Sequence, residues 1–224
     1  MPCAIVLGMH RSGTSALAGT LHHLGVNMGS RLLVGNRETN PKGHFEDTEL
    51  VMLNEVAIGG DWRNPRQVHS PIVRQRFETY VAQRAGTGEE KLWGVKDPRL
   101  CFTFRMFRHA LQTNLVAPML VVNHRSREAV ASSLKARGSL RNVPAEVIFD
   151  RYQAAIEDVC GSFDGPTLHV DYDELVEDPN LVAQRLSMFL GIDDGSPEYW
   201  EGIQAAERFI APELRHWPEE ETTT

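Results

Sequence analysis

Cysteine is scarce in this 224-residue sequence: Cys3, Cys101 and Cys160 are odd in number and widely scattered. They predict neither a disulfide framework nor a metal cluster. Long hydrophobic runs are lacking too, which argues against a membrane-spanning helix. The first apolar run begins almost at Met1 and leaves no room for a signal peptide before it. We therefore expect a cytoplasmic protein with no membrane span.

Positive charge is not in excess either, because the formal net charge is -7 at pH 7. This charge argues against a general nucleic-acid-binding protein but leaves room for a local basic pocket. A composition of 42% hydrophobic and 24% charged residues is typical of a globular protein. The length suits one sizeable core. We expect residues 1–224 to form a single domain, with a disordered acidic tail from about residue 218.

The segment GMHRSGTS, residues 8–15, connects two elements of different kinds. Residues 4–7 before it are all apolar and predict a buried strand, whereas Leu17, Leu21 and Leu24 after it recur at helical spacing. A loop between a strand and a helix aims backbone N–H groups and the positive end of the helix dipole at one small volume. Such a volume suits phosphate or sulfate.

The loop lacks the lysine of a nucleotide-hydrolysing phosphate loop. Gly8 and Gly13 have the spacing of G-x-x-x-x-G-K-S/T, but Thr14 replaces the lysine and Ser15 follows it. A cation stands inside the loop instead, since Arg11 can bind an oxyanion through two parallel hydrogen bonds. The alternative is that the two glycines only close a tight turn. The adjoining strand, helix and hydroxyl groups favour the anion-binding loop.

Strands and helices alternate along the rest of the chain. Hydrophobic patterns predict strands at residues 4–7, 91–96, 118–123 and 167–170. They predict further helices at residues 46–58, 71–85, 102–111, 126–136, 144–160, 180–190 and 197–209. This alternation predicts an α/β fold with a parallel β-sheet flanked by helices. With the loop of residues 8–15, the fold is expected to be of the P-loop nucleotide-binding type. Ligands of such sheets bind beyond the carboxyl ends of the strands, which draws together residues 8–15, 96–99, 125–127 and 171–172.

A second anion-binding pattern occurs in LVVNHRSREAVASSL, which runs from a predicted strand directly into a helix. Arg125 stands at the end of the strand, and Ser126 is placed to cap the helix. Ser133 lies seven residues beyond Ser126, so the two hydroxyl groups share a helical face. Arg125 and Ser133 can therefore converge on one phosphate. Taken alone, the pattern is explained better by an ordinary surface arginine and a helical serine.

Together the two patterns resemble the fingerprint of the sulfotransferase family, which binds the donor 3′-phosphoadenosine 5′-phosphosulfate (PAPS). The first loop is similar to the family's R/K-S-G-T-T/S segment on the 5′ side of the donor. The family holds the 3′-phosphate with an arginine after a strand and a serine eight residues later, as Arg125 and Ser133 are spaced here. The resemblance implies donor contacts from Arg11, Ser12, Gly13, Thr14, Ser15, Arg125 and Ser133.

Other segments extend the resemblance over most of the chain. VDYDELVEDP is similar to the family's Y-E-D-L-x-x-D-P segment, which implies that Tyr172 lies near the adenine. NPKGHFED and WGVKDPRL resemble segments of bacterial members. The chain departs from many relatives in having Arg11 for lysine, KDPR for a K-T-H segment, and no glycine-rich loop near its C-terminus.

The resemblance implies a sulfotransferase fold and transfer of the sulfuryl group from PAPS to a hydroxyl or amine. The product is 3′,5′-adenosine bisphosphate (PAP), the acceptor is a small molecule or a carbohydrate, and no metal is required. The absent histidine leaves the family's usual base without a match. Nothing in the sequence identifies the acceptor, and the oligomeric state stays open.

Transfer of a sulfuryl group needs cations around the donor and a base for the acceptor proton. We expect Arg11 and the Thr14 and Ser15 hydroxyls to bracket the phosphosulfate, and Lys96 to hold the bridging oxygen. For the base we favour Glu46, at the start of a predicted helix, with His44 and Glu38 as alternatives. Glu46 also fits a first-turn acid that complements the helix dipole. The other histidines, including His10, His22 and His23, lack ligand spacing and are expected to be structural or solvated.

Two other functions compete with sulfuryl transfer. A P-loop phosphotransferase would use ATP and magnesium, with Asp97 as the metal ligand; Thr14 in place of lysine argues against it. A non-catalytic nucleotide-binding relative would keep the pocket without turnover. The acceptor pocket is expected among Trp62, Arg63, Phe102, Phe104 and the polar stretch after Gly29, although such aromatic residues also suit the core.

Overall fold

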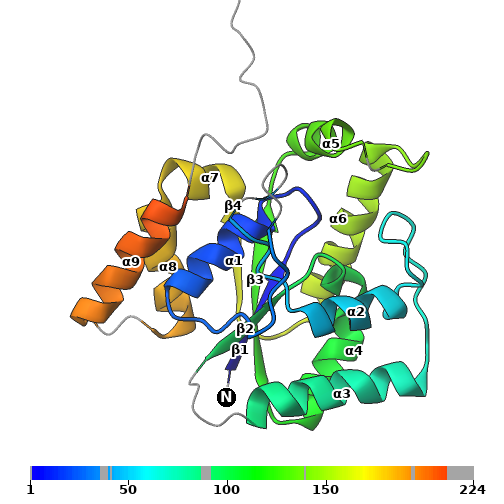
Figure 1. The fold of residues 1–224 in the computed structure, drawn as a ribbon, viewed down its shortest axis with the longest axis horizontal. Coiled ribbons are helices and arrows are strands. Elements are labelled where there is room, and N and C mark those ends of the chain that lie inside the picture. Colours follow the sequence, from blue (N-terminus) through cyan, green and yellow to red (C-terminus); the bar gives the residue numbers. More distant parts are fainter. Residues whose placement is uncertain are drawn as a thin grey trace, which may run out of the picture.

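The computed structural model describes residues 2–35, 40, 42–86, 92–138, 140–192 and 195–210. The predicted α/β fold is confirmed: four parallel strands form one sheet in the order β2-β1-β3-β4, with helices on both faces (Figure 1). The strands are β1 (Pro2–Leu7), β2 (Trp93–Lys96), β3 (Ala117–His124) and β4 (Thr167–Asp171). Glu38 and the predicted acidic tail from about residue 218 lie outside the described residues.

Helices occur at all the predicted positions, with ends that differ by a few residues. The nine described helices are α1 (Thr14–His23), α2 (Thr48–Ala57), α3 (Pro71–Gly86), α4 (Leu100–Thr113), α5 (Arg127–Ala136), α6 (Ala145–Ser162), α7 (Tyr172–Glu177), α8 (Pro179–Leu190) and α9 (Pro197–Phe209). The short helix α7 was not predicted, because six residues are too few to show a helical period. None of the described helices has both the length and the apolar character needed to cross a membrane.

Two hydrophobic cores form on opposite faces of the sheet, because successive side chains of a strand point to opposite sides. In β1, Cys3, Ile5 and Leu7 pack into the core beneath α3, α4 and α6. Ala4 and Val6 pack on the other face, beneath α1 and α8. Both faces of β1 are thus covered, which explains its unbroken apolar sequence.

Helix α2 begins later than predicted. The side chain of Asp47 accepts hydrogen bonds from the backbone N–H groups of Glu49 and Leu50, so Asp47 caps the helix and Thr48 begins it. The prediction that Glu46 opens this helix is therefore wrong by two residues. Since Glu46 precedes the cap, its carboxylate is not the first-turn acid that would complement the helix dipole.

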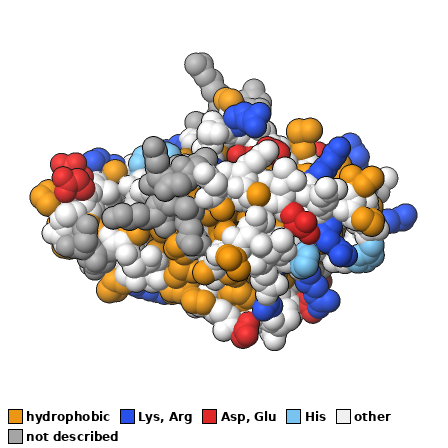
Figure 2. All heavy atoms as spheres, turned by 90° about the horizontal axis from the view of Figure 1, so that it is seen from below, with side chains coloured by type: hydrophobic (Ala, Val, Ile, Leu, Met, Phe, Trp, Pro, Cys, Tyr) orange, Lys and Arg blue, Asp and Glu red, His pale blue; other side chains and the backbone are white. Residues whose placement is uncertain are grey.

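All four strands run in the same direction, so their carboxyl ends gather at one edge of the sheet. The loop into α1, the start of α5 and the start of α7 all follow these ends (Figure 1). Figure 2 shows the molecule from the opposite end, where the strands begin. Hydrophobic side chains occupy the centre of that face, and acidic and basic ones are interspersed around its margin.

Candidate functional site

The loop of residues 8–15 is held open by its own side chains and by the sheet. The Ser12 hydroxyl donates to the Met9 carbonyl at 2.8 Å, and the Asn123 amide on β3 donates to the Ser12 carbonyl at 2.7 Å. Helix α1 begins directly after the loop at Thr14. The first N–H groups of a helix have no partner within it, so those of Thr14 and Ser15 are available to an anion.

Two residues of this loop adopt left-handed backbone conformations, Arg11 with φ 68° and Gly13 with φ 95°. Alternating backbone conformations of this kind turn successive N–H groups toward one point. A Cβ atom at Gly13 would lie 2.0 Å from Cδ2 of Tyr172. Only glycine therefore fits between the loop and the Tyr172 ring, and the loop and the start of α7 form one wall.

A pocket opens above the loop at the carboxyl ends of the strands. It is lined by nearly all the site residues predicted from the sequence, which come from five separate segments: Arg11, Gly13, Thr14, Ser15, His44, Glu46, Lys96, Arg125, Ser133 and Tyr172. Ser12 does not line it. Its side chain is buried and binds within the loop, so it shapes the loop rather than facing the pocket.

The two anion-binding patterns meet in this pocket. Nε of Arg11 donates to the hydroxyl of Ser133 at 2.9 Å, across 122 positions of sequence. Arg125 donates to the Arg11 carbonyl at 3.0 Å, and its guanidinium lies 4.4 Å from the centre of the Tyr172 ring. Burial lowers the pKa of Arg11, and the nearby charges of Arg137 and Arg125 lower it further. Such a concentration of like charge favours binding of an anion.

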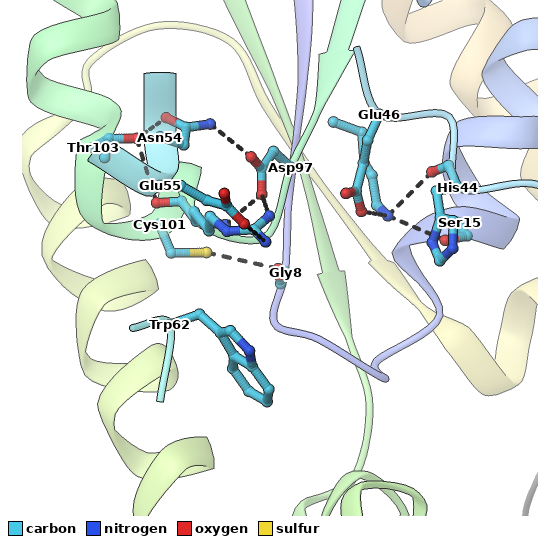
Figure 3. Close-up of polar contacts among 12 residues, drawn as sticks. Gly8, Ser15, His44, Glu46, Asn54, Glu55, Trp62, Asp97, Cys101 and Thr103 are labelled. Atoms are coloured by element: carbon cyan, nitrogen blue, oxygen red, sulfur yellow. Dashed lines mark hydrogen bonds and ion pairs between the residues drawn. The ribbon is translucent and has the colours of Figure 1, made fainter. Parts of the chain in front are cut away.

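Lys96 lies on the other side of the loop, in a buried polar cluster. Its Nζ atom donates to Oε1 of Glu46 at 2.6 Å, to Oγ of Ser15 at 3.1 Å and to the His44 carbonyl at 3.2 Å. Figure 3 shows Glu46, His44 and Ser15 converging there. The Lys96 and Glu46 side chains are only 2% and 8% exposed, so the ion pair is shielded from solvent.

Asn40 connects His44 to the loop. Its side-chain amide lies 3.2 Å from the Ser15 hydroxyl and 3.2 Å from Nδ1 of His44. Burial lowers the pKa of His44, an effect that Glu46 opposes and Lys96 reinforces. The polar stretch after Gly29 thus contributes to the pocket, as the sequence predicted.

Asp97 points away from the pocket, although it adjoins Lys96 in sequence (Figure 3). Its Oδ1 atom accepts from Arg99 at 2.9 Å, and its Oδ2 atom accepts from the Asn54 amide at 2.9 Å. Burial raises the pKa of Asp97, and the Arg99 charge opposes the rise. The carboxylate is committed to fixing the turn after β2, so the structure gives no support to its proposed role as a magnesium ligand. No group of three or more metal-ligating side chains occurs in the described part of the chain.

The aromatic residues suggested for the acceptor pocket lie elsewhere. Phe104 is 1% exposed in the core, and Phe102 packs on the Tyr152 ring at 4.6 Å. The Arg63 guanidinium lies 4.4 Å from the Trp62 ring, and neither residue lines the pocket. The prediction that these side chains line it is wrong, because they fill the space between α4, α6 and the loop after α2.

Two charged or titratable residues of the pocket were not expected there from the sequence, His10 and Arg137. His10 was expected to be structural or solvated, but it lies in the loop itself, beside Arg11. Its ring packs 4.3 Å from that of Trp62. The sequence did contain a signal for Arg137, which follows Ser133 by one helical turn and so shares its face of α5. Lys42 belongs to the polar stretch after Gly29, which was expected to line the pocket, and it does so.

The state of His10 yields a prediction about stability. Burial holds its pKa well below the ordinary value of 6.5, and Arg99, Lys96, Arg137 and Arg63 add to the effect. The folded protein therefore keeps this imidazole neutral where the unfolded chain takes up a proton, so stability is lost as pH falls through about 6.5. When the pH is lowered from 7.5 to 5.5, the free energy of unfolding of His10→Gln should fall by about 1 kcal/mol less than that of the wild type. Urea denaturation at both pH values measures this, and equal losses in the two proteins would contradict it.

Solved structures share this architecture. The sulfotransferase domain from the Synechococcus PCC 7002 olefin synthase aligns with a TM-score of 0.56 and 18% identity, over 94% of this chain and 95% of that one. The sulfotransferase domain from the curacin biosynthetic pathway aligns with a TM-score of 0.55 and 14% identity, over 96% and 89%. Sulfotransferase STF9 from Mycobacterium avium aligns with a TM-score of 0.50 and 15% identity, over 98% and 69%.

At these identities the likeness establishes the fold. The chain has the fold of sulfotransferase domains, with the sheet and its helices aligned over almost its whole length. A scan against protein-family models gives no match, and a search of curated proteins by sequence gives none either.

Proposed function

We propose that this chain is a sulfotransferase that moves the sulfuryl group of PAPS to a hydroxyl or amine of a small-molecule or carbohydrate acceptor. The observation that carries the proposal is the hydrogen bond from Arg11 to Ser133. It joins the two sequence patterns, which were recognised separately, in one pocket on a sulfotransferase fold. A nucleotide with phosphate groups at both ends suits such a pocket.

We infer one orientation for the donor in this pocket. Its phosphosulfate lies over the start of α1, where Arg11, Thr14 and Ser15 surround it, and its 3′-phosphate lies beside Arg125 and Ser133. An apolar wall remains for the adenine, formed by Tyr172, Val176, Phe209 and Ile210. In this placement the end of α9 lies on the adenine side of the pocket.

The transfer then requires stabilisation of the leaving charge, a base for the acceptor proton and a fixed position for the phosphate. The acceptor oxygen forms a bond to sulfur as the bond between sulfur and the bridging phosphate oxygen breaks, and the electron pair of that bond stays on the phosphate. Arg11 and Lys96 stabilise the negative charge that develops there. Glu46 takes the acceptor proton, and the loop N–H groups hold the phosphate in place.

Lys96 and Glu46 are suited to act together. Without a ligand, Lys96 neutralises Glu46 through their 2.6 Å contact, which keeps two buried charges paired. A donor phosphosulfate offers Lys96 a stronger anionic partner. As Lys96 turns toward the donor, the Glu46 carboxylate becomes available to the acceptor proton.

Calorimetry separates this function from its rivals. PAP should bind with a micromolar or lower dissociation constant in the absence of magnesium, because the pocket itself supplies the cations. A phosphotransferase would instead bind ATP only with magnesium, and that result would contradict the proposal. A non-catalytic relative would bind PAP but release no labelled sulfuryl group to any member of a panel of alcohols, phenols, amines and sugars.

A further inference from the structure

One cation of the pocket belongs to neither anion-binding pattern. Arg137 follows the last residue of α5 and lines the pocket together with His10 and His44. Its charge lowers the pKa of Arg11, of His10 and of His44. Since Arg137 lines the same pocket as residues of the loop and His44, its side chain lies near both.

The other cations are engaged by groups of the chain itself. Lys96 pairs with Glu46, Lys42 donates to the Phe209 carbonyl, and Arg125 donates to the Arg11 carbonyl. No carboxylate forms an ion pair with Arg137 in the part of the chain that the structure describes. Glu46 is the one acid among the described lining residues, and Lys96 already neutralises it. Within the described residues, Arg137 therefore adds a positive charge to the pocket that no carboxylate neutralises.

The direct donor contacts in the proposed function come from other side chains. In the proposed function, Arg11 and Lys96 hold the phosphosulfate, and Arg125 with Ser133 holds the 3′-phosphate. An acceptor that reaches Glu46 shares the pocket with His10, His44 and Arg137, which line it together with Glu46. An arginine at that place suits a carboxylate, which it binds through two parallel hydrogen bonds.

Building on the proposed function, we propose that Arg137 binds a carboxylate of the acceptor, which makes the acceptor class hydroxy acids, uronic acids included. Arg137 takes no part in the bonds that form or break. It positions the acceptor so that its hydroxyl reaches Glu46 and the sulfur.

Matched pairs of an acid and its methyl ester test this assignment. With saturating PAP, calorimetry would compare 4-hydroxybenzoate, glucuronate and 3-hydroxybutyrate with their methyl esters. The wild type should bind the acid of at least one pair about 10-fold more tightly than the ester, since a charged hydrogen bond is involved. Arg137→Ala should abolish the preference, Arg137→Lys should keep part of it, and Arg137→Glu should favour the ester.

The PAP affinity of the same variants shows which substrate Arg137 serves. Arg137→Ala and the control Arg127→Ala, on the same helix but paired with Asp150, should each change it less than about 3-fold. No acid preference in any wild-type pair, a preference that survives in Arg137→Ala, or a loss of PAP affinity in that variant would overturn the assignment. Failure of the wild type to bind PAP would overturn the proposed function itself.

Discussion

Replacing Glu46 with glutamine is expected to lower the turnover number about 10²–10⁴-fold, the usual contribution of a general base. Glutamine keeps the size of the side chain and can still accept a hydrogen bond from Lys96, but it cannot take up a proton. The affinity for PAP should stay within about 3-fold of wild type, because Glu46 does not hold the donor. Single-turnover transfer of labelled sulfuryl groups and calorimetry with PAP measure the two effects.

Glu49→Gln is a matched control. Glu49 lies three residues along the chain, has a side chain 41% exposed and pairs with Arg31 outside the pocket. Its turnover should match that of the wild type. If Glu46→Gln kept full turnover, the base would be another residue, and His44 is the first to replace, since Lys96 donates to its carbonyl in the same cluster.

Replacing Arg11 with alanine is expected to weaken PAP binding about 100-fold. The arginine lies at the meeting point of both anion sites, and charged hydrogen bonds contribute about 1.5–3 kcal/mol each. Ser133→Ala should weaken binding about 10-fold, since it removes one hydroxyl and leaves Arg11 in place. In the double variant the two losses should not add, because the side chains contact each other at 2.9 Å.

Arg11 also occupies a left-handed backbone conformation, which strains a residue other than glycine. Alanine bears this strain as arginine does, so Arg11→Ala should have a melting temperature close to that of the wild type. Thermal denaturation measures it, and an unchanged value means that weak binding cannot be attributed to unfolding. Arg127→Ala controls for the loss of a positive charge at the same edge of the sheet. Equal PAP affinity in Arg11→Ala and wild type would contradict the donor site.

The parts of the site that follow directly from strands were predictable. An apolar run that ends in glycine and hydroxyl residues places the loop, and Ser126 caps α5 as its position before the helix indicates. Because all the strands are parallel, Arg11, Lys96, Arg125 and Tyr172 had to gather at one edge. The hydrogen bond from Arg11 to Ser133 could not be predicted from the sequence, since it depends on the side-chain conformations.

The rest depends on contacts between distant segments. Glu46 was placed at the start of a helix by the apolar period of residues 50–57, which does not fix the first residue, and only the hydrogen bonds of Asp47 show where α2 begins. Trp62 and Phe102 have the composition of a ligand pocket, yet they pack around Tyr152 and His10. Spacing along the chain does not reveal which of two apolar environments receives an aromatic ring.

A crystal structure of the protein with PAP tests the donor site most directly. The 5′-phosphate should lie at the start of α1 within hydrogen-bond distance of Arg11, and the 3′-phosphate should contact Arg125 and Ser133. The adenine should lie against Tyr172. A nucleotide bound outside this pocket, or one whose 3′-phosphate contacts neither Arg125 nor Ser133, would contradict the assignment.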